Sequence, residues 1–165
     1  MIVLGLDPGT AITGYGLVRE EDSQAIAVAH GVITTPSDQA LPDRLVTIYH
    51  EITRLVEQYR PDHAAVEQLF FNKNVRTALA VGHSRGVVLL ALAQANIRIF
   101  EYTPLEVKQA ITGNGRADKR QIQEMIKLLL NLDQIPKPDD AADALAIAVC
   151  HLHSARITAL YEYRR

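Results

Sequence analysis

The sequence is short of cysteine and of long apolar runs. Its one cysteine in 165 residues, Cys150, excludes an intramolecular disulfide, and its place in the apolar run 144–150 is typical of a reduced, buried thiol. No apolar run approaches the roughly 20 residues that a membrane-spanning helix needs. The first residues also lack the basic segment, apolar stretch and cleavage site of a secretory signal. We therefore expect a soluble, cytoplasmic protein.

An excess of positive charge is absent too. The chain has 17 basic and 19 acidic residues, a net charge of −2, which at first argues against a nucleic-acid partner. Whole-chain charge is a weak guide, however, where the functional site is itself a cluster of acids that holds cations. With 48% hydrophobic residues and no repeat or linker, residues 1–165 are expected to form one domain with a substantial core.

Hydrophobic periodicity predicts an α/β fold that begins with three strands in an antiparallel meander. The strands are expected at residues 2–6, 14–19, 25–34, 63–66 and 97–102. The helices are expected at residues 42–59, 75–96, 104–111, 118–130 and 140–154. Asp118 and Gln121 form a plausible capping box at one helix start. The order predicts a five-stranded mixed sheet, the meander plus parallel strands, flanked by helices on both faces.

Two acids stand where predicted strands end. Asp7 follows the first strand and precedes Pro8-Gly9, and Glu67 follows the apolar run 63–66. Carboxylates at the carboxyl ends of strands face the crevice where α/β sheets bind ligands. The alternative is structural: Asp7 as a turn residue, and Glu67 as a strand-end acid that reaches water.

Two more acids, Asp140 and Asp143, open the last predicted helix and lie on one face of it. Acids also cap helix N-termini, and Asp139 and Asp140 could serve only that purpose. Three acids within 139–143, just before an apolar run, nevertheless repel each other more than capping requires, and a cation would relieve this. Oxygen ligands without a His or Cys cluster favour Mg²⁺, with Mn²⁺ as a substitute. Two such ions about 3.5–4 Å apart suit in-line attack on a phosphodiester.

Basic and aromatic residues accompany the acids. The basic residues that gather within twenty positions of one another are Lys108, Arg116, Lys119, Arg120 and Lys127. They fit a phosphate-binding flank or an ordinary solvated helix face. Phe70 and Phe71 follow Glu67, and at least one could leave the core to stack on a base, with Lys73 and Arg76 on backbone phosphates. His83 and His151 fit structural histidines in helices, and no histidine is assigned a catalytic role.

The motifs together resemble the RuvC family of Holliday-junction resolvases, whose fold is RNase H-like. The similar segments are LGLDPGTAITGYGLV (4–18), AVEQLFFNKN (65–74), GHSRGV (82–87), FEYTPLEVKQAITGNGRADKRQIQ (100–123) and DDAADALAIAVCHLH (139–153). They cover nearly the whole chain in the family's order. The resemblance implies a Mg²⁺-dependent endonuclease that makes paired symmetric nicks in junction strands of like polarity, near a thymine, in recombination and DNA repair.

The resemblance also implies roles for particular residues. The catalytic, metal-binding carboxylates fall on Asp7, Glu67, Asp140 and Asp143, two ions being held per active site. The two essential basic positions match Lys108 and Lys119, and the aromatic that engages unpaired junction bases matches Phe70. Asp139 departs from the commoner family pattern. A homodimer, with Gly82 and Gly86 at its seam, and a branch-migration complex of RuvA and RuvB type are the implied partners, besides four-way junction DNA.

Two other functions remain open at this point. Actin-like ATPases and sugar kinases share a strand followed by DxGT, but they need two such domains and this chain has the length of one. A non-catalytic junction-binding module is the second alternative, in which the acids are only caps.

Overall fold

The computed structural model describes residues 1–68 and 75–162, with side chains placed for residues 1–68 and 78–155. The strands are β1 (Ile2–Asp7), β2 (Ile12–Glu21), β3 (Gln24–Thr34), β4 (His63–Glu67) and β5 (Arg98–Tyr102). The helices are α1 (Leu41–Tyr59), α2 (Val75–Gln94), α3 (Pro104–Thr112), α4 (Lys119–Leu129) and α5 (Asp139–Glu162). The predicted α/β order is therefore confirmed.

The strands form one mixed sheet in the order β3-β2-β1-β4-β5. β1, β2 and β3 pair antiparallel, as the predicted meander requires, and β4 and β5 add parallel to β1. The β2–β3 turn is tighter than predicted, because only Asp22 and Ser23 separate the two strands. Both have positive φ, at 46° and 64°, the conformation that matches a two-residue turn to the twist of a hairpin.

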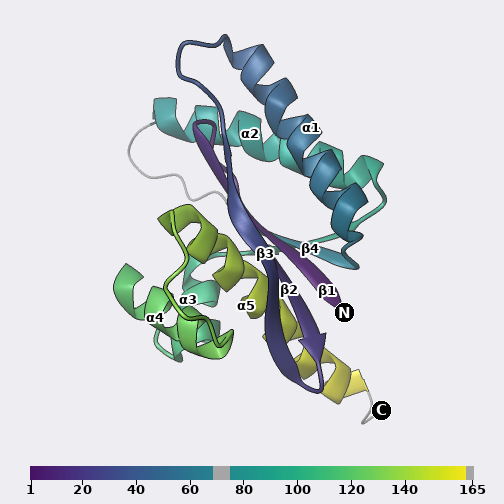
Figure 1. Ribbon diagram of the computed structural model, residues 1–165, viewed down its shortest axis with the longest axis vertical. Coiled ribbons are helices and arrows are strands. Elements are labelled where there is room, and N and C mark those ends of the chain that lie inside the picture. The colour runs from purple at the N-terminus through teal and green to yellow at the C-terminus, as the bar shows by residue number, and fades with distance from the viewer. Residues whose placement is uncertain (69–74, 163–165) are drawn as a thin grey trace.

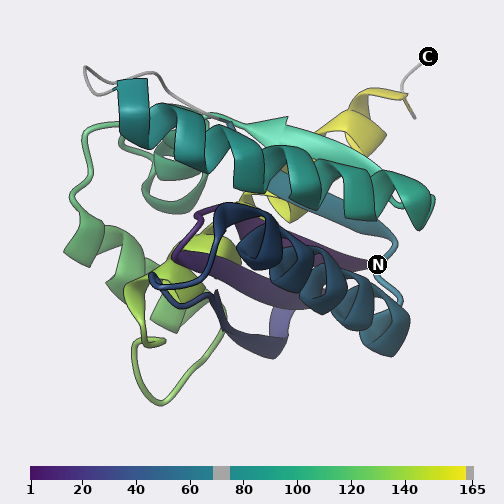
Figure 2. The same cartoon turned by 90° about the horizontal axis from the view of Figure 1, so that it is seen from above.

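Helices cover both faces of the sheet (Figure 1). On one face α1 and α2 contact each other and pack on alternate residues of the strands, such as Leu4, Leu6 and Leu17. On the other face α5 lies along the sheet, with α3 and α4 beyond it, over Val3, Val18 and Ala65. Figure 2 shows α1 and α2 in front of the sheet and α5 behind it. The strands therefore contribute one set of side chains to each of two cores.

Local signals account for several helix boundaries. Asp118 and Gln121 make the predicted capping box at the start of α4, and Thr103 and Glu106 make another before α3. Arg60 ends α1 in the left-handed conformation, its N–H bonded to the Val56 carbonyl, directly before Pro61. The described helices include none that is both long and apolar enough to span a bilayer.

The closest packing in the fold lies between α5 and the first two strands. Gly5 and Gly16 face each other across the β1–β2 pair, and Asp7 pairs with Gly14 one step further along the same face. A Cβ built on Gly14 would lie 2.1 Å from the Asp140 carbonyl oxygen, and one on Gly16 would lie 2.7 Å from the Leu145 nitrogen. The helix backbone thus occupies the space that side chains would need.

Replacing Gly16 with alanine should therefore destabilise the protein. The new methyl group meets backbone atoms of Leu145, so the helix must shift, and such overpacking costs about 1–3 kcal/mol. Urea unfolding measures the difference. Gly86→Ala is the matched control, because no heavy atom of the described residues outside its own stretch of α2 lies within 4 Å of its Cβ position. Alanine there should be neutral or stabilising by up to about 1 kcal/mol. Equal effects of the two changes would contradict the backbone-contact argument.

Candidate active site

Asp7 is held at the end of β1 by the turn that follows it. Thr13 is fully buried, and its hydroxyl donates to the Gly9 carbonyl at 2.7 Å. Thr10, within the turn, donates through its hydroxyl to the Ala80 carbonyl of α2 at 2.7 Å. The Asp-Pro-Gly-Thr segment is therefore a turn, as the structural interpretation required, but a turn anchored at both ends. This anchoring fixes the backbone from which the Asp7 side chain projects.

Glu67 occupies the matching position on the neighbouring strand. Leu6 pairs with Val66, so Asp7 and Glu67 end adjacent parallel strands side by side. Both lie on the α5 face, because Gly5 of β1 and Ala65 of β4 also face that helix. Glu67 is only partly exposed, so the idea of a strand-end acid that simply reaches water is not what the structure shows.

Asp140 and Asp143 approach from the first turn of α5. The contact of α5 with Gly14 brings the Asp140 backbone next to the strand position that pairs with Asp7. Asp143, one turn later, accepts a hydrogen bond from the Lys119 ammonium at 3.0 Å. Lys119 also lies 3.6 Å from Asp139, which in turn contacts Lys137 at 2.9 Å. The four carboxylates thus come from two strand ends and one helix start, as predicted.

The charges of this cluster perturb one another. Burial raises the pKa of Asp7 to about 6, and the charges of Asp143 and Asp140 add to the shift. Burial raises the pKa of Glu67 to about 7, with further contributions from Asp7 and Asp143. Lys119 opposes both shifts. Burial also raises the pKa of Asp143, although the Lys119 hydrogen bond works against it. The charge contributions show that these carboxylates lie near one another.

The surroundings of Lys119 favour its charged form, whereas those of the acids disfavour theirs. Burial lowers its pKa, but the hydrogen bond and charge of Asp143, with Asp139 and Asp140, outweigh that effect and raise it. Lys119 therefore remains a cation beside the acids. It is the positive charge that partly compensates them in this structure.

A cleft of about 260 Å³ opens beside the acids. Its polar wall consists of Glu67, Asp143, Lys108 and Lys119. Its apolar wall consists of Pro104, Val107, Ile122, Ala146 and Ile147. The structure thus brings both predicted basic residues, Lys108 from α3 and Lys119 from α4, to the carboxylates. A cleft lined by both signs of charge can bind an anionic group next to a cation.

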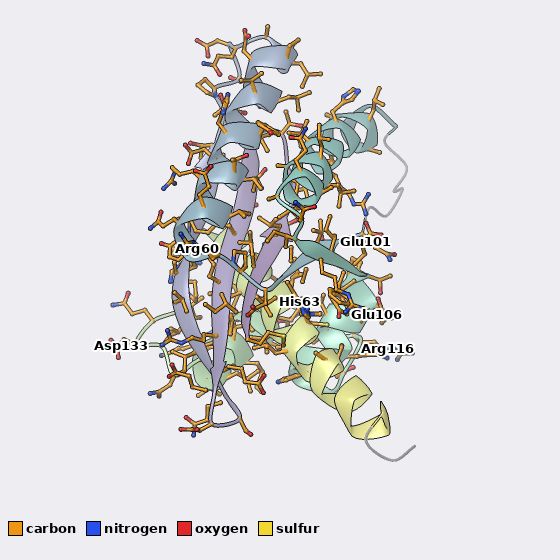
Figure 3. All side chains as sticks on the ribbon, turned by 90° about the vertical axis from the view of Figure 1, so that its right-hand side faces the viewer. Arg60, His63, Glu101, Glu106, Arg116 and Asp133 are labelled. Carbon is orange, nitrogen blue, oxygen red and sulfur yellow. The ribbon has the colours of Figure 1, made fainter. Side chains whose placement is uncertain are left out.

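Two other predicted contact residues, among those the structure describes, lie outside this cleft. Arg116 and Arg120 are exposed on the α3–α4 side of the molecule, outside this cleft, and Figure 3 labels Arg116 there. Phe70, Phe71 and Lys73 fall outside the described residues. Arg76 belongs to α2, but its side chain is not among those described.

His151 has a structural role in the core. His151 is 2% exposed, and its two ring nitrogens contact His63 Nδ1 at 2.9 Å and the Tyr102 hydroxyl at 2.8 Å. Burial lowers the pKa of His151 to about 4, with the charge of His63 adding to the shift. Figure 3 shows His63 between β4 and α5. His83, in contrast, is exposed.

The donor set suits a hard divalent cation, although it is not arranged as a finished coordination sphere. Among the side chains described, no three of the His, Cys, Asp and Glu type converge closely enough to enclose an ion. The raised pKa values of Asp7 and Glu67 nevertheless record an excess of negative charge in a buried place. Carboxylate oxygens are the ligands that Mg²⁺ and Mn²⁺ prefer. The residues present therefore fit such ions. In this structure the Lys119 ammonium is hydrogen-bonded to Asp143.

A five-stranded mixed sheet with helices on both faces, and acids gathered at the ends of β1 and β4, defines a nuclease of RNase H-like fold. The yeast mitochondrial Holliday junction resolvase Ydc2 shares this fold, with a TM-score of 0.63 at 17% identity over 92% of this chain and 78% of that one. The family model for the crossover junction endodeoxyribonuclease RuvC matches residues 3–151. The chain belongs to this RuvC family.

Individual relatives are similar to this chain over nearly its whole length. A crossover junction endodeoxyribonuclease RuvC from Alkaliphilus oremlandii is 56% identical over 164 residues, which cover 99% of this chain and 100% of the relative. One from Rubrobacter xylanophilus is 58% identical over 96% of this chain and 88% of the relative. The structure of T. thermophilus RuvC in complex with a Holliday junction substrate superposes with a TM-score of 0.92, at 34% identity and 96% coverage of both chains.

Local sequence patterns did not single out the residues that make this site possible. The close approach of α5 to the sheet depends on Gly5, Gly14 and Gly16, which were not predicted to lie against that helix. The available signal was the alternation in Gly14-Tyr-Gly16, which places two glycines on one face of a strand. The hydrogen bond between Lys119 and Asp143 was also not predicted, because no local pattern encodes it.

Neutralising Asp7 should stabilise the metal-free protein at high pH. The pKa of Asp7 in the folded state, about 6, lies above its ordinary value of 3.8. Its contribution to stability is thus fully present below pH 4 and is lost as the pH rises through 6. At pH 8 and in the presence of a chelator, Asp7→Asn should raise the free energy of unfolding by on the order of 1–3 kcal/mol.

Urea unfolding at several pH values measures this difference. It should grow between pH 4 and 7 and then level off. Asp133→Asn, at an exposed acid in the loop before α5, serves as control and should leave stability unchanged at every pH. A metal-free Asp7→Asn protein no more stable than the wild type at pH 8 would show that Asp7 is under no repulsion.

Proposed function

We propose that this protein is a structure-selective endodeoxyribonuclease that resolves Holliday junctions by paired, symmetric nicks in strands of like polarity. Its membership of the crossover junction endodeoxyribonuclease RuvC family carries the activity. The observation that supports the site is the cluster of carboxylates at the ends of β1 and β4 and the start of α5. These carboxylates disfavour one another's charge, and two lysines lie beside them. The whole chain, residues 1–165, acts as one nuclease domain.

Asp7, Glu67, Asp140 and Asp143 are the proposed metal ligands. Two Mg²⁺ ions, replaceable by Mn²⁺, supply activation of a water molecule and neutralisation of charge on the phosphate when they are bound. Asp7 ends the central strand β1 between Glu67 and the α5 acids, which suits it to a ligand shared by both ions. Donors spread over two strand ends and one helix start would hold two ions beside one phosphate.

The lysines take part as cations rather than as ligands. Lys119 is held on Asp143 at 3.0 Å, where it keeps an ammonium within reach of a phosphate oxygen entering the cleft. Lys108 lies on the same cleft wall and adds a second positive charge for the phosphate. Both lysines therefore bind and orient the scissile phosphate and oppose its developing negative charge.

The DNA itself is proposed to extend beyond the cleft. Arg116 and Arg120 are exposed on the α3–α4 side, where they can contact backbone phosphates of a four-way junction. Phe70, Phe71, Lys73 and Arg76, which lie beyond the described side chains, are proposed for base stacking and phosphate contact on the strength of the family resemblance.

Symmetric nicking needs two active sites, and we propose a homodimer with its seam along α2. Leu79 and Leu90, both of this helix, are 61% and 52% exposed, and Gly86 has open space around it. A branch-migration complex of RuvA and RuvB type and action in the cytoplasm are further proposals from the resemblance. The actin-like ATPase alternative is not retained, because the family model spans residues 3–151.

A cleavage assay on a synthetic four-way junction tests the activity. With Mg²⁺, the wild type should nick two opposite strands of the junction and leave a linear duplex of the same sequence intact, as mapped on sequencing gels. Asp7→Asn should bind the junction but cut it at least about 10³-fold more slowly. Asp133→Asn should cut like the wild type. Undiminished cutting by Asp7→Asn would refute the site, and binding without metal-dependent cutting by the wild type would favour the non-catalytic module.

Cation affinity should depend on pH in a defined direction. A metal ligand must lose its proton, and the pKa of the metal-free Glu67 carboxyl is about 7. The affinity for Mn²⁺ should therefore rise as the pH increases from 6 to 8, as followed by the electron paramagnetic resonance signal of free Mn²⁺. The Glu67→Gln protein should bind more weakly, with a flatter dependence over this range. If the Mn²⁺ affinity of the wild type did not change between pH 6 and 8, Glu67 would be excluded from the ligand set.

A further inference from the structure

Helix α2 contacts both sheet carboxylates indirectly, through two adjacent residues. Ser84 is fully buried, and its hydroxyl lies 2.8 Å from the Thr10 hydroxyl in the turn after Asp7. Arg85, the next residue, donates from Nε to the backbone carbonyl of Glu67 at 3.3 Å. One helix thus holds the chain at both strand ends from which the proposed ligands project.

The contact at the Asp7 turn is a complete hydrogen-bond chain. Thr10 has one hydroxyl hydrogen, and it is directed to the Ala80 carbonyl at 2.7 Å. With the Thr10 hydrogen on the Ala80 carbonyl, to which Ser84 has only the longer contact of 3.4 Å, Ser84 is the donor in its bond to Thr10. The Thr35 hydroxyl donates to the Thr10 carbonyl and accepts from Arg44 Nε at 2.8 Å. The turn is fastened to α2 on one side and to the end of β3 on the other.

The contact at Glu67 depends on a second ion pair. Arg85 Nη2 contacts the Glu101 carboxylate of β5, so the guanidinium spans from α2 to two neighbouring strands. Figure 3 labels Glu101 at the tip of β5. Only 19% of the Arg85 side chain is exposed, which makes this pair less screened than an ordinary surface one. A bond to the Glu67 carbonyl restricts rotation of that peptide unit, and so the direction in which the Glu67 side chain leaves the strand.

We propose that α2 is a brace for the active site, in which Arg85 and Ser84 are positioning residues that hold Glu67 and Asp7 at the separation the metal ions need. This inference deepens the proposed function and depends on it. Neither residue is a catalytic residue, because each acts through the backbone of another. The α5 acids reach the site from the opposite face of the sheet, so the brace sets only the two strand-borne ligands.

Metal binding by the DNA-free protein is the direct test. In a titration with MnCl₂ at pH 7.5, followed by electron paramagnetic resonance, Arg85→Ala should weaken binding about tenfold, the usual cost of losing a residue that orients a metal ligand. Ser84→Ala should weaken it in the same direction. Arg85→Lys keeps a cation for Glu101 but loses the planar donor set, and should fall between wild type and Arg85→Ala. Arg54→Ala is the matched control, because Arg54 forms an exposed pair with Glu51 on α1, and it should bind like the wild type.

A second readout separates positioning from a loss of folding. The Mg²⁺ concentration for half-maximal junction cleavage should rise about tenfold in Arg85→Ala, while junction affinity in metal-free buffer and the circular dichroism spectrum stay unchanged. If Arg85→Ala does not fold, Arg85→Lys and Ser84→Ala carry the same comparison. Wild-type Mn²⁺ affinity in all folded brace variants would overturn the inference, as would an equal loss in Arg54→Ala.

The Mn²⁺ affinity of Asp7→Asn distinguishes a failure of the proposed metal site from a failure of the brace. If Asp7→Asn binds Mn²⁺ like the wild type, the proposed metal site itself fails. If Asp7→Asn loses binding but the Arg85 and Ser84 variants do not, the metal site stands and only the brace is refuted.

Discussion

The site depends on how closely helix α5 approaches strands β1 and β2. Three glycines, Gly5, Gly14 and Gly16, leave no side chains on that part of the sheet, so the helix backbone lies directly against the strand backbone. Because Asp7 pairs with Gly14 and α5 contacts Gly14 through Asp140, the same approach that fills the core also brings the acids of the helix to the acid of the strand. A larger residue at these positions would push α5 away from the sheet and so separate the acids of the helix from Asp7.

That approach has an electrostatic cost. Burial raises the pKa values of Asp7, Glu67 and Asp143, and neighbouring carboxylates add to each of these shifts. Lys119 offsets part of this repulsion from α4, and cations would offset the rest. The protein thus keeps a locally unfavourable arrangement that becomes useful when ions and a phosphate arrive, a balance between stability and function that is common at active sites.

The two faces of the sheet divide the work of building the site. The α5 face supplies the acids and the cleft with its lysines, whereas the α2 face supplies hydrogen bonds to the turn after Asp7 and to the Glu67 carbonyl. Each of these layers packs on the sheet through its own hydrophobic core. Carboxylates from one sheet and one helix can then keep a defined separation without any single loop carrying them, which suits a reaction that needs exact placement of charge.

From the sequence alone it was possible to obtain the element order, the meander, the mixed sheet and the capping box of α4, because alternation, helical spacing and capping residues are local properties of the chain. The acids were also recognisable, as residues that interrupt apolar runs at Asp7, Glu67 and the start of α5. What no local pattern contains is proximity. Tertiary packing decided which acids lie near one another, that Lys119 binds Asp143, and that Ser84 and Arg85 reach Thr10 and Glu67. The three hydrogen bonds alone join residues 18 to 74 positions apart. The pKa values follow from those contacts and from burial, and only the folded protein has them.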